Sequence, residues 1–333
     1  MIQIFDLFCG MGGGSEGVMR MLSELDLSAE VTLGVDADTN AARIFAARFP
    51  ASAVWTEDVR TAGPAVMSMI RPEAITLLIA GPPCQGHSPL NNRTRGDDPR
   101  NSLYRWTVSH AIEVGYDFVI IENVRNIVHS QGDPIGAAEV VLASAGYATR
   151  RVLLRGEDVG VAQRRRRLFL VASRRPLDGF EVEVEVEPAP TCGEVLARPL
   201  PADGARGIPR LSKANLERMA WMHAKSGRFR VSHASGLLPP SHGPDRSHTD
   251  AYGRMDPDDY APTITGNSGT LGAGRFGHPT EPRLCSLREL ARLQDFPDDF
   301  PLPTDVGTTA TRKALGNAIP PGMTAAIIRT LFA

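Results

Sequence analysis

The chain has 333 residues, which favours two domains or one large domain with an insertion. With 42% hydrophobic and 22% charged residues it is not disordered as a whole, and no apolar run approaches the roughly 20 residues of a membrane helix. The net charge of −2 excludes a polycation, although 33 of the 36 basic residues are arginines, three being lysines. Most of these arginines can reflect codon bias alone.

The cysteines and the N-terminus indicate the cellular compartment. Four cysteines show neither the spacing of a zinc site nor a dense disulfide framework. The first residues enter an apolar pattern directly, without the basic segment of a signal peptide. We therefore expect a reduced, cytoplasmic protein without membrane contact.

The first half alternates short apolar runs with amphipathic stretches, as in a parallel α/β sheet. We predict strands at 2–8, 31–36, 53–58, 74–81 and 117–124 and helices at 15–25, 39–48, 101–114 and 134–145. An antiparallel pair is predicted at 149–154 and 166–172. The class is α/β.

The pattern changes after residue 175. Residues 181–187 alternate Glu and Val, which predicts a strand with one apolar face. From 188 to about 282 the chain is rich in Pro, Gly, Ser and His, so we predict a loop-rich second domain whose one helix is 210–222. Helices return at 286–295 and 321–331.

A glycine-rich turn, Gly10 to Gly14, follows the first strand. Strand, glycine turn and helix together bring backbone close to a nucleotide-like ligand, although a structural tight turn is also compatible. Asp36, ending the second strand, is placed to hold ribose hydroxyls, and Asp58, ending the third, to accept from an adenine amino group. These residues favour an adenosine cofactor and leave hydride and methyl chemistry open.

Cys84 follows Pro82 and Pro83 at the end of a buried strand. The carboxyl edge of a parallel sheet is where such folds place their sites, so a nucleophilic thiol is the better interpretation. For the remaining cysteines, Cys9, Cys192 and Cys285, we expect small buried hydrophobic residues.

Glu122 ends the fifth strand and should face the same edge as Cys84. Partial desolvation there favours a carboxyl group that acts as an acid. Gln163, Arg165 and Arg167 belong to a run of four arginines and share one side by strand alternation. That side is predicted to meet a bound anion or base.

These motifs, in this order, resemble those of the DNA cytosine-5 methyltransferases. The resemblance also covers Arg288 to Pro297 and Gly316 to Pro321, and leaves only about 176–260 unmatched. It implies a Rossmann-like methyltransferase fold that uses S-adenosyl-L-methionine and releases S-adenosyl-L-homocysteine, with a smaller loop-rich target-recognition domain.

The resemblance implies that Cys84 adds to C6 of a flipped-out cytosine and makes C5 nucleophilic. Glu122 would then act at N3 and Arg165 at the O2 edge, with Gln163 and Arg167 completing the catalytic set. The implied cofactor contacts are Asp6, Phe8, Gly10, Gly12, Gly13, Asp36, Asp58, Val59, Pro83, Leu103, Asn317 and Ala318. No metal is expected, because the histidines form no ligand pattern.

Asn317 lies in the last motif, so the C-terminal end should return to the first domain. We predict a catalytic domain of 1–175 plus 303–333 and a small domain of 176–302, with target recognition at about 176–280. The implied partner is double-stranded DNA, with a cognate restriction endonuclease as a further partner and a monomeric, nucleoid-associated enzyme. Candidate DNA contacts are Gln85, Ser88, Arg93, Arg228, Arg230, His233, Arg246, His248 and Arg254.

Three alternatives stay open. A tRNA cytosine-5 methyltransferase shares the chemistry, but its usual Cys-Phe-Thr stretch is absent from the sequence. A catalytically silent DNA-binding relative is disfavoured by the intact Cys84, Glu122 and Arg165. A nicotinamide oxidoreductase would explain the glycine turn alone.

Overall fold

The computed structural model describes residues 1–83, 101–129, 133–183, 188–227, 229–240 and 251–333. The chain forms two compact units. Unit 1 contains Met1–Arg155, Arg166–Val184 and Ala318–Ala333, and unit 2 contains Gly156–Arg165 and Glu185–Asn317. Among the described residues, no helix combines the length and apolarity that a bilayer crossing requires.

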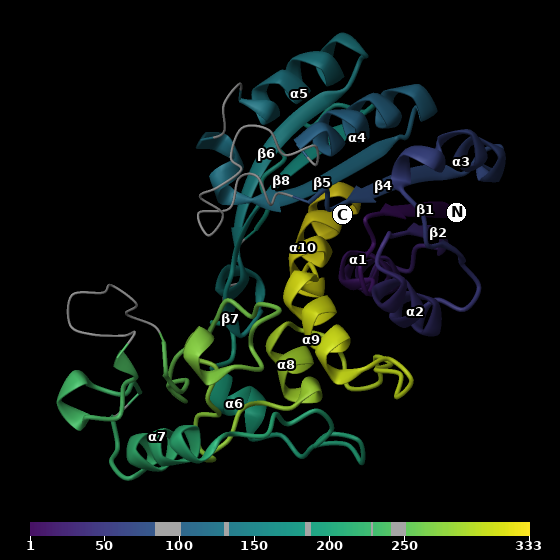
Figure 1. Ribbon diagram of the computed structural model, residues 1–333. Helices are drawn as coiled ribbons and strands as arrows, with labels where there is room; N and C mark the ends of the chain where they lie inside the picture. The colour runs from purple at the N-terminus through teal and green to yellow at the C-terminus, as the bar shows by residue number, and fades with distance from the viewer. Residues whose placement is uncertain (84–100, 130–132, 184–187, 228, 241–250) are drawn as a thin grey trace. The chain divides into compact units, whose positions relative to one another are not determined.

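Unit 1 is built on a seven-stranded sheet of order β3-β2-β1-β4-β5-β8-β6 (Figure 1). The strands are β1 (Ile2–Leu7), β2 (Ala29–Val35), β3 (Ala53–Trp55), β4 (Ile75–Ala80), β5 (Phe118–Val124), β6 (Ala148–Arg155) and β8 (Arg166–Ser173). Strands β1 to β5 pair in parallel, and β8 runs antiparallel to both of its neighbours. The α/β class and the antiparallel pair are therefore confirmed.

Helices pack on both faces of this sheet. They are α1 (Gly13–Glu24), α2 (Thr39–Arg48), α3 (Gly63–Met69), α4 (Asn101–Val114), α5 (Pro134–Ser144) and α10 (Pro321–Phe332), with short turns η1 (Val59–Thr61) and η2 (Arg125–His129). Figure 1 shows α4 and α5 on one face and α1 and α10 on the other. On the first face, Leu78 and Ile121 of the sheet join Val108 of α4 and Leu142 of α5 in one buried core.

The C-terminal helix α10 packs closely against α1 within unit 1. Gly17 makes this approach possible, because a Cβ there would overlap the carbonyl oxygen of Pro321. The Thr324 hydroxyl donates to the Gly14 carbonyl oxygen at 3.0 Å. The last helix is thereby fixed beside the glycine-rich turn.

Unit 2 has little regular structure. It contains α6 (Cys192–Leu196), α7 (Lys213–His223), α8 (Leu287–Leu293) and α9 (Thr308–Asn317), the short parallel pair β7 (Gln163–Arg164) and β9 (Ala261–Pro262), and the turns η3 (Gly156–Val159), η4 (His233–Ser235) and η6 (Leu271–Ala273). The prediction of one helix in its loop-rich part was wrong, since α6 precedes α7. Residues 181–183 form no strand, and the rest of the predicted strand lies outside the described residues.

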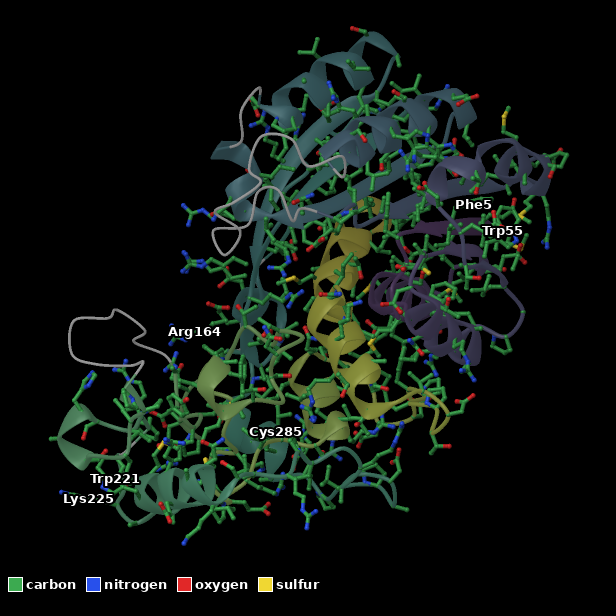
Figure 2. All side chains as sticks on the ribbon, viewed as in Figure 1. Phe5, Trp55, Arg164, Trp221, Lys225 and Cys285 are labelled. Atoms are coloured by element: carbon green, nitrogen blue, oxygen red, sulfur yellow. The ribbon has the colours of Figure 1, made fainter. Side chains whose placement is uncertain are left out.

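Arginine side chains supply much of the hydrogen bonding in unit 2. The Arg206 guanidinium donates to the carbonyl oxygens of Leu302, Pro303 and Val306 at 2.5 to 2.9 Å. Arg312 reaches the carbonyl of Cys285, a residue labelled in Figure 2. Buried loop carbonyls need a donor, and the five N–H groups of arginine provide several at once. Codon bias is therefore not needed to explain these arginines.

The units differ from the predicted domain boundaries at three places. Residues 156–165 and 303–317 lie in unit 2, where the sequence placed them in the catalytic domain. Residues 176–183 lie in unit 1, where the sequence placed them in the small domain. Helix α9 packs against α8, which keeps it in unit 2. The functional division between catalysis and target recognition stays a prediction.

Candidate active site

The glycine-rich turn after β1 has an unusual backbone. Phe8, Gly10 and Gly12 have φ angles of 61°, 53° and 95°, a region that favours glycine. The carboxylate of Asp36, just beyond β2, accepts from the Gly10 N–H at 2.8 Å and from the Asp38 N–H at 2.7 Å. Asp36 is thus fixed beside the turn, and its contact with a ligand stays a prediction.

Asp6, in β1 just before this turn, is buried. The residue is 3% exposed, and its carboxylate accepts a 2.6 Å hydrogen bond from the Ser15 hydroxyl. Burial raises the pKa of Asp6 to about 7, against the lowering effect of the Ser15 hydrogen bond. The contacts favour a role in holding the turn for this predicted cofactor residue.

Asp58 and Val59 follow β3 and have separate environments. Asp58 pairs with Arg60 at 2.5 Å, and the hydrogen bonds from Arg60 lower the pKa of Asp58, so it is an anion at neutral pH. Val59 is buried in the core that Phe8 and Leu103 partly enter. The half-buried Phe8 ring retains exposed surface beside the glycine turn.

The end of β4 meets both the glycine turn and the C-terminal segment within unit 1. A Cβ at Gly14 would lie 3.6 Å from the Ile319 side chain, and one at Gly81 would lie 3.8 Å from it. Ala318 is buried next to Ile319. Asn317 belongs to unit 2, so the predicted motif crosses the boundary between the units.

Glu122 and Arg167 form an ion pair at the carboxyl end of β5. The Arg167 Nε and Glu122 Oε1 atoms lie 2.6 Å apart, and the side chains are 15% and 13% exposed. The strand register explains the contact, because Val124 of β5 pairs with Arg167 of β8, which brings Glu122 diagonally opposite on the same face. Glu122 is thereby held at the sheet edge by a planar cation.

The chain that leads to Cys84 passes this ion pair. A Cβ at Gly81 would lie 3.7 Å from Glu122 Oε2, and the Asn123 side chain donates to the Pro82 carbonyl oxygen at 3.3 Å. Pro83 follows, and Cys84 is joined directly to it in the sequence. Cys84 itself lies outside the described residues.

Gln163 and Arg165 belong to unit 2, whereas Arg167 belongs to unit 1. Arg165 is 1% exposed and donates to the carbonyl oxygens of Ile264 and Gly316 at 3.0 and 3.2 Å. The Gln163 side chain accepts from the Ile264 N–H at 2.8 Å. Gln163 and Arg165 therefore share a side, as alternation predicts, but these contacts are with backbone.

The candidate DNA contacts divide into three groups. Arg230 and His233 are exposed. Arg254 is 6% exposed, donates to the Pro279 carbonyl at 2.5 Å and stacks over the Phe229 ring, so we leave it out of the proposed DNA-contacting set. The others lie outside the described residues: Gln85, Ser88, Arg93, Arg228, Arg246 and His248.

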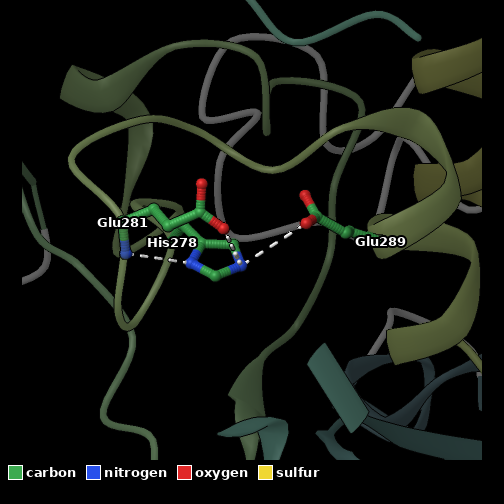
Figure 3. Close-up of side chains that lie close together, drawn as sticks. All are labelled: His278, Glu281 and Glu289. Atoms are coloured by element: carbon green, nitrogen blue, oxygen red, sulfur yellow. Dashed lines mark hydrogen bonds and ion pairs between the residues drawn. The ribbon is translucent and has the colours of Figure 1, made fainter. Parts of the chain in front are cut away.

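His278, Glu281 and Glu289 gather in unit 2 with their ligand atoms within 4.8 Å of one another (Figure 3). His278 Nδ1 accepts from the Glu281 N–H at 3.1 Å, so the proton of the neutral ring lies on Nε2, which is 3.4 Å from Glu289. Arg283 pairs with both glutamates. Burial raises the pKa of Glu289, but the Arg283 and His278 hydrogen bonds outweigh burial and lower it. This arrangement is an ion-pair network and not a cation site.

No role was predicted from the sequence for Asn123, Ser286 or Glu289. Asn123 follows Glu122, and the contact between neighbouring strand ends could have suggested its bond to Pro82. The capping box of Ser286 and Glu289 has a readable sequence signature, S-x-x-E. The contacts of Glu289 with His278 and Arg283 have no such local signal.

Residues 2–333 match the protein family described as C-5 cytosine-specific DNA methylase. The Type II methyltransferase M1.BsuMI of Bacillus subtilis is 31% identical over 340 residues, which cover 96% of this chain and 78% of that protein. The Type II methyltransferase M1.HphI of Haemophilus parahaemolyticus is 28% identical, and the alignment covers 99% of this chain and 87% of that protein. One solved structure is described as a DNA modification methyltransferase encoded within an E. coli prophage. It aligns with a TM-score of 0.71 at 22% identity, and the alignment covers 100% of this chain and 99% of that one.

Proposed function

Because this chain belongs to the C-5 cytosine-specific DNA methylase family, we propose that it methylates C5 of cytosine within a specific double-stranded DNA sequence. The methyl donor is S-adenosyl-L-methionine, and S-adenosyl-L-homocysteine is released. The names of its relatives favour a Type II restriction-modification methylase, with a cognate endonuclease as functional partner. It acts as a monomer in the cytoplasm on nucleoid DNA.

The proposed reaction begins at Cys84. Its thiolate forms a bond to C6, and the C5–C6 electron pair moves to C5, which becomes the nucleophile. C5 bonds to the methyl group as the bond from that group to the donor's sulfonium sulfur breaks, which leaves S-adenosyl-L-homocysteine. Water then accepts the C5 proton, and the S–C6 bond breaks to restore the ring and return the thiolate. The target base must leave the duplex, because the helix stack covers C6.

The contact that carries this proposal is the Glu122–Arg167 ion pair at the sheet edge where the Cys84 segment begins. Glu122 donates a proton to N3 of the cytosine and so opposes the negative charge that develops on the ring. Arg167, which touches Glu122, is better placed than Arg165 to meet the O2 edge. Arg165, with its bonds to Ile264 and Gly316, holds the backbone of unit 2.

The residues around the glycine turn fit an adenosine-containing methyl donor. A Cβ at Gly10 would meet no atom within 4 Å, so this part of the turn borders open space. The anchored carboxylate of Asp36 would hold ribose hydroxyls, the anionic Asp58 the adenine amino group, and the Phe8 ring the adenine face. When bound, the donor supplies an electrophilic methyl group. Leu103, Pro83 and the backbone of Gly12, Gly13, Val59 and Ala318 complete the proposed pocket within unit 1.

A methyl-transfer assay tests this function. Purified protein and radiolabelled S-adenosyl-L-methionine are incubated with unmethylated bacterial DNA and, in parallel, with tRNA. We expect label in DNA, located on C5 of cytosine after digestion, and none in tRNA. Label in tRNA alone would establish the tRNA alternative, and donor binding without transfer to either would favour the catalytically silent relative. Binding of NAD in place of the methyl donor would refute the proposal.

A further inference from the structure

Three arginines lie side by side at the carboxyl edge of the unit 1 sheet. Arg155, the last residue of β6, pairs directly with Arg166, the first residue of β8. On the other side of β8, Arg167 pairs with Val124, and Arg125 follows Val124 as the first residue of η2, which lies close to β8. Neighbouring strands are about 4.8 Å apart, which makes this arginine row (Arg125, Arg166 and Arg155) about 10 Å long.

The three arginines of the row are exposed, and none of them forms a salt bridge with a carboxylate among the described residues. Arg151 on β6, by contrast, pairs with Glu139 at 2.5 Å, and Arg167 pairs with Glu122. Like charges placed directly opposite each other in an antiparallel pair are destabilising. The Arg155–Arg166 pair therefore carries an unfavourable repulsion that a bound anion would relieve.

The position of the row relates it to the proposed reaction. Arg166 precedes Arg167, which contacts Glu122, so by strand alternation the Arg166 side chain leaves the opposite face of the sheet at the same edge. All three arginines lie at the edge of the sheet where β5 ends. Along one strand of a duplex, successive phosphates advance about 3.4 Å along the axis, so a 10 Å row matches about three nucleotides. Planar guanidinium groups suit phosphate oxygens in two-pronged hydrogen bonds.

We propose that Arg125, Arg166 and Arg155 bind backbone phosphates of the DNA substrate beside the target cytosine. This inference rests on the proposed function and adds a substrate-binding surface on unit 1 to the recognition segment of unit 2. The row positions DNA and reads no base, because phosphate contacts are independent of sequence.

The test compares wild type with the double variant Arg155→Gln, Arg166→Gln. The matched control is Arg150→Gln, Arg175→Gln, which removes the same charge at the opposite edge of the sheet, near the start of β6 and the end of β8. Binding of a short fluorescent duplex that carries the methylated sequence is measured from low to high salt. Each lost phosphate contact should reduce the slope of log K against log salt by about 0.9.

We expect the row variant to lose one or two such contacts and about tenfold in DNA affinity, the equivalent of 1.4 kcal/mol. The kcat of the row variant at saturating DNA should match that of wild type. The control variant should match wild type in DNA affinity, salt slope and kcat. The Tm of the row variant should equal or exceed that of wild type, since the repulsion is removed. The inference would be overturned if the row and control variants had equal salt slopes. It would also be overturned if the row variant had a lower Tm than wild type or lost kcat without losing DNA affinity. Weaker tRNA binding with unchanged duplex binding would overturn it as well. If wild type itself does not methylate DNA, the proposed function fails instead.

Discussion

Replacing Asp6 with asparagine should remove a pH-dependent loss of stability. Asp6 is fully buried, and its pKa is about 7 against an ordinary value of 3.8. The folded chain therefore retains a proton that the unfolded chain releases between these two pH values. The contribution of protonated Asp6 to the free energy of unfolding is therefore fully present below pH 3.8. It falls as the pH rises towards 7 and does not change further above that pH.

The magnitude comes from the two pKa values. At about 1.4 kcal/mol for each tenfold change, the ionised form of Asp6 costs the folded state about 4 kcal/mol above pH 7. An asparagine side chain preserves an oxygen for the Ser15 hydroxyl and has no proton to release. Between pH 4 and pH 8 the free energy of unfolding of wild type should therefore fall by about 4 kcal/mol relative to that of the variant.

Urea unfolding at several pH values measures this difference. Other carboxyl groups titrate in the same range, but they are common to both proteins and cancel. Asp178→Asn, which removes an exposed carboxylate, is the matched control. A difference between Asp6→Asn and wild type that stays flat from pH 4 to pH 8 would refute the burial argument.

The remaining predictions concern packing and chemistry. Gly17→Ala should destabilise the protein by about 1–3 kcal/mol, because the methyl group would overlap the Pro321 carbonyl. This effect should exceed the better helix propensity of alanine. An unchanged urea midpoint would show that α1 and α10 can separate without a loss of stability. Arg206→Lys should cost about 2 kcal/mol, since an ammonium group cannot serve three carbonyls in the same geometry, and calorimetry would detect the lower Tm. Glu122→Gln should lower kcat by 10²- to 10⁴-fold at unchanged DNA affinity. Arg167→Lys, which preserves the charge but not the two-pronged geometry, should lower kcat less; wild-type kcat in both variants would remove the ion pair from the mechanism.

The sequence predicted the parts of the molecule that depend on local pattern. The apolar runs placed the strands of the sheet within a few residues, because buried parallel strands are continuous in apolar residues. The position of Asp36 beside the glycine turn followed from the strand–turn–helix order. Glu122 could be placed at the carboxyl edge for the same reason.

Other features depend on contacts between distant segments and could not be predicted. Strand alternation put Arg165 and Arg167 on one face, but the two residues belong to different units, and only the pairing of β8 with β5 brings Arg167 to Glu122. The burial of Asp6 and its hydrogen bond with Ser15 have no local signal in the sequence. The carbonyl contacts of Arg206 join segments about a hundred residues apart, so its sequence neighbours do not reveal them.

Base-resolution bisulfite sequencing tests the central claim most directly. A bacterial host without cytosine methylation would express the wild-type protein or the Cys84→Ser variant, with both confirmed as soluble. We predict methylated cytosines at one short sequence motif with wild type and none with the variant. Methylation that persists in the Cys84→Ser host would contradict the nucleophilic mechanism, and an unmethylated genome with soluble wild-type protein would contradict the assignment of DNA as substrate.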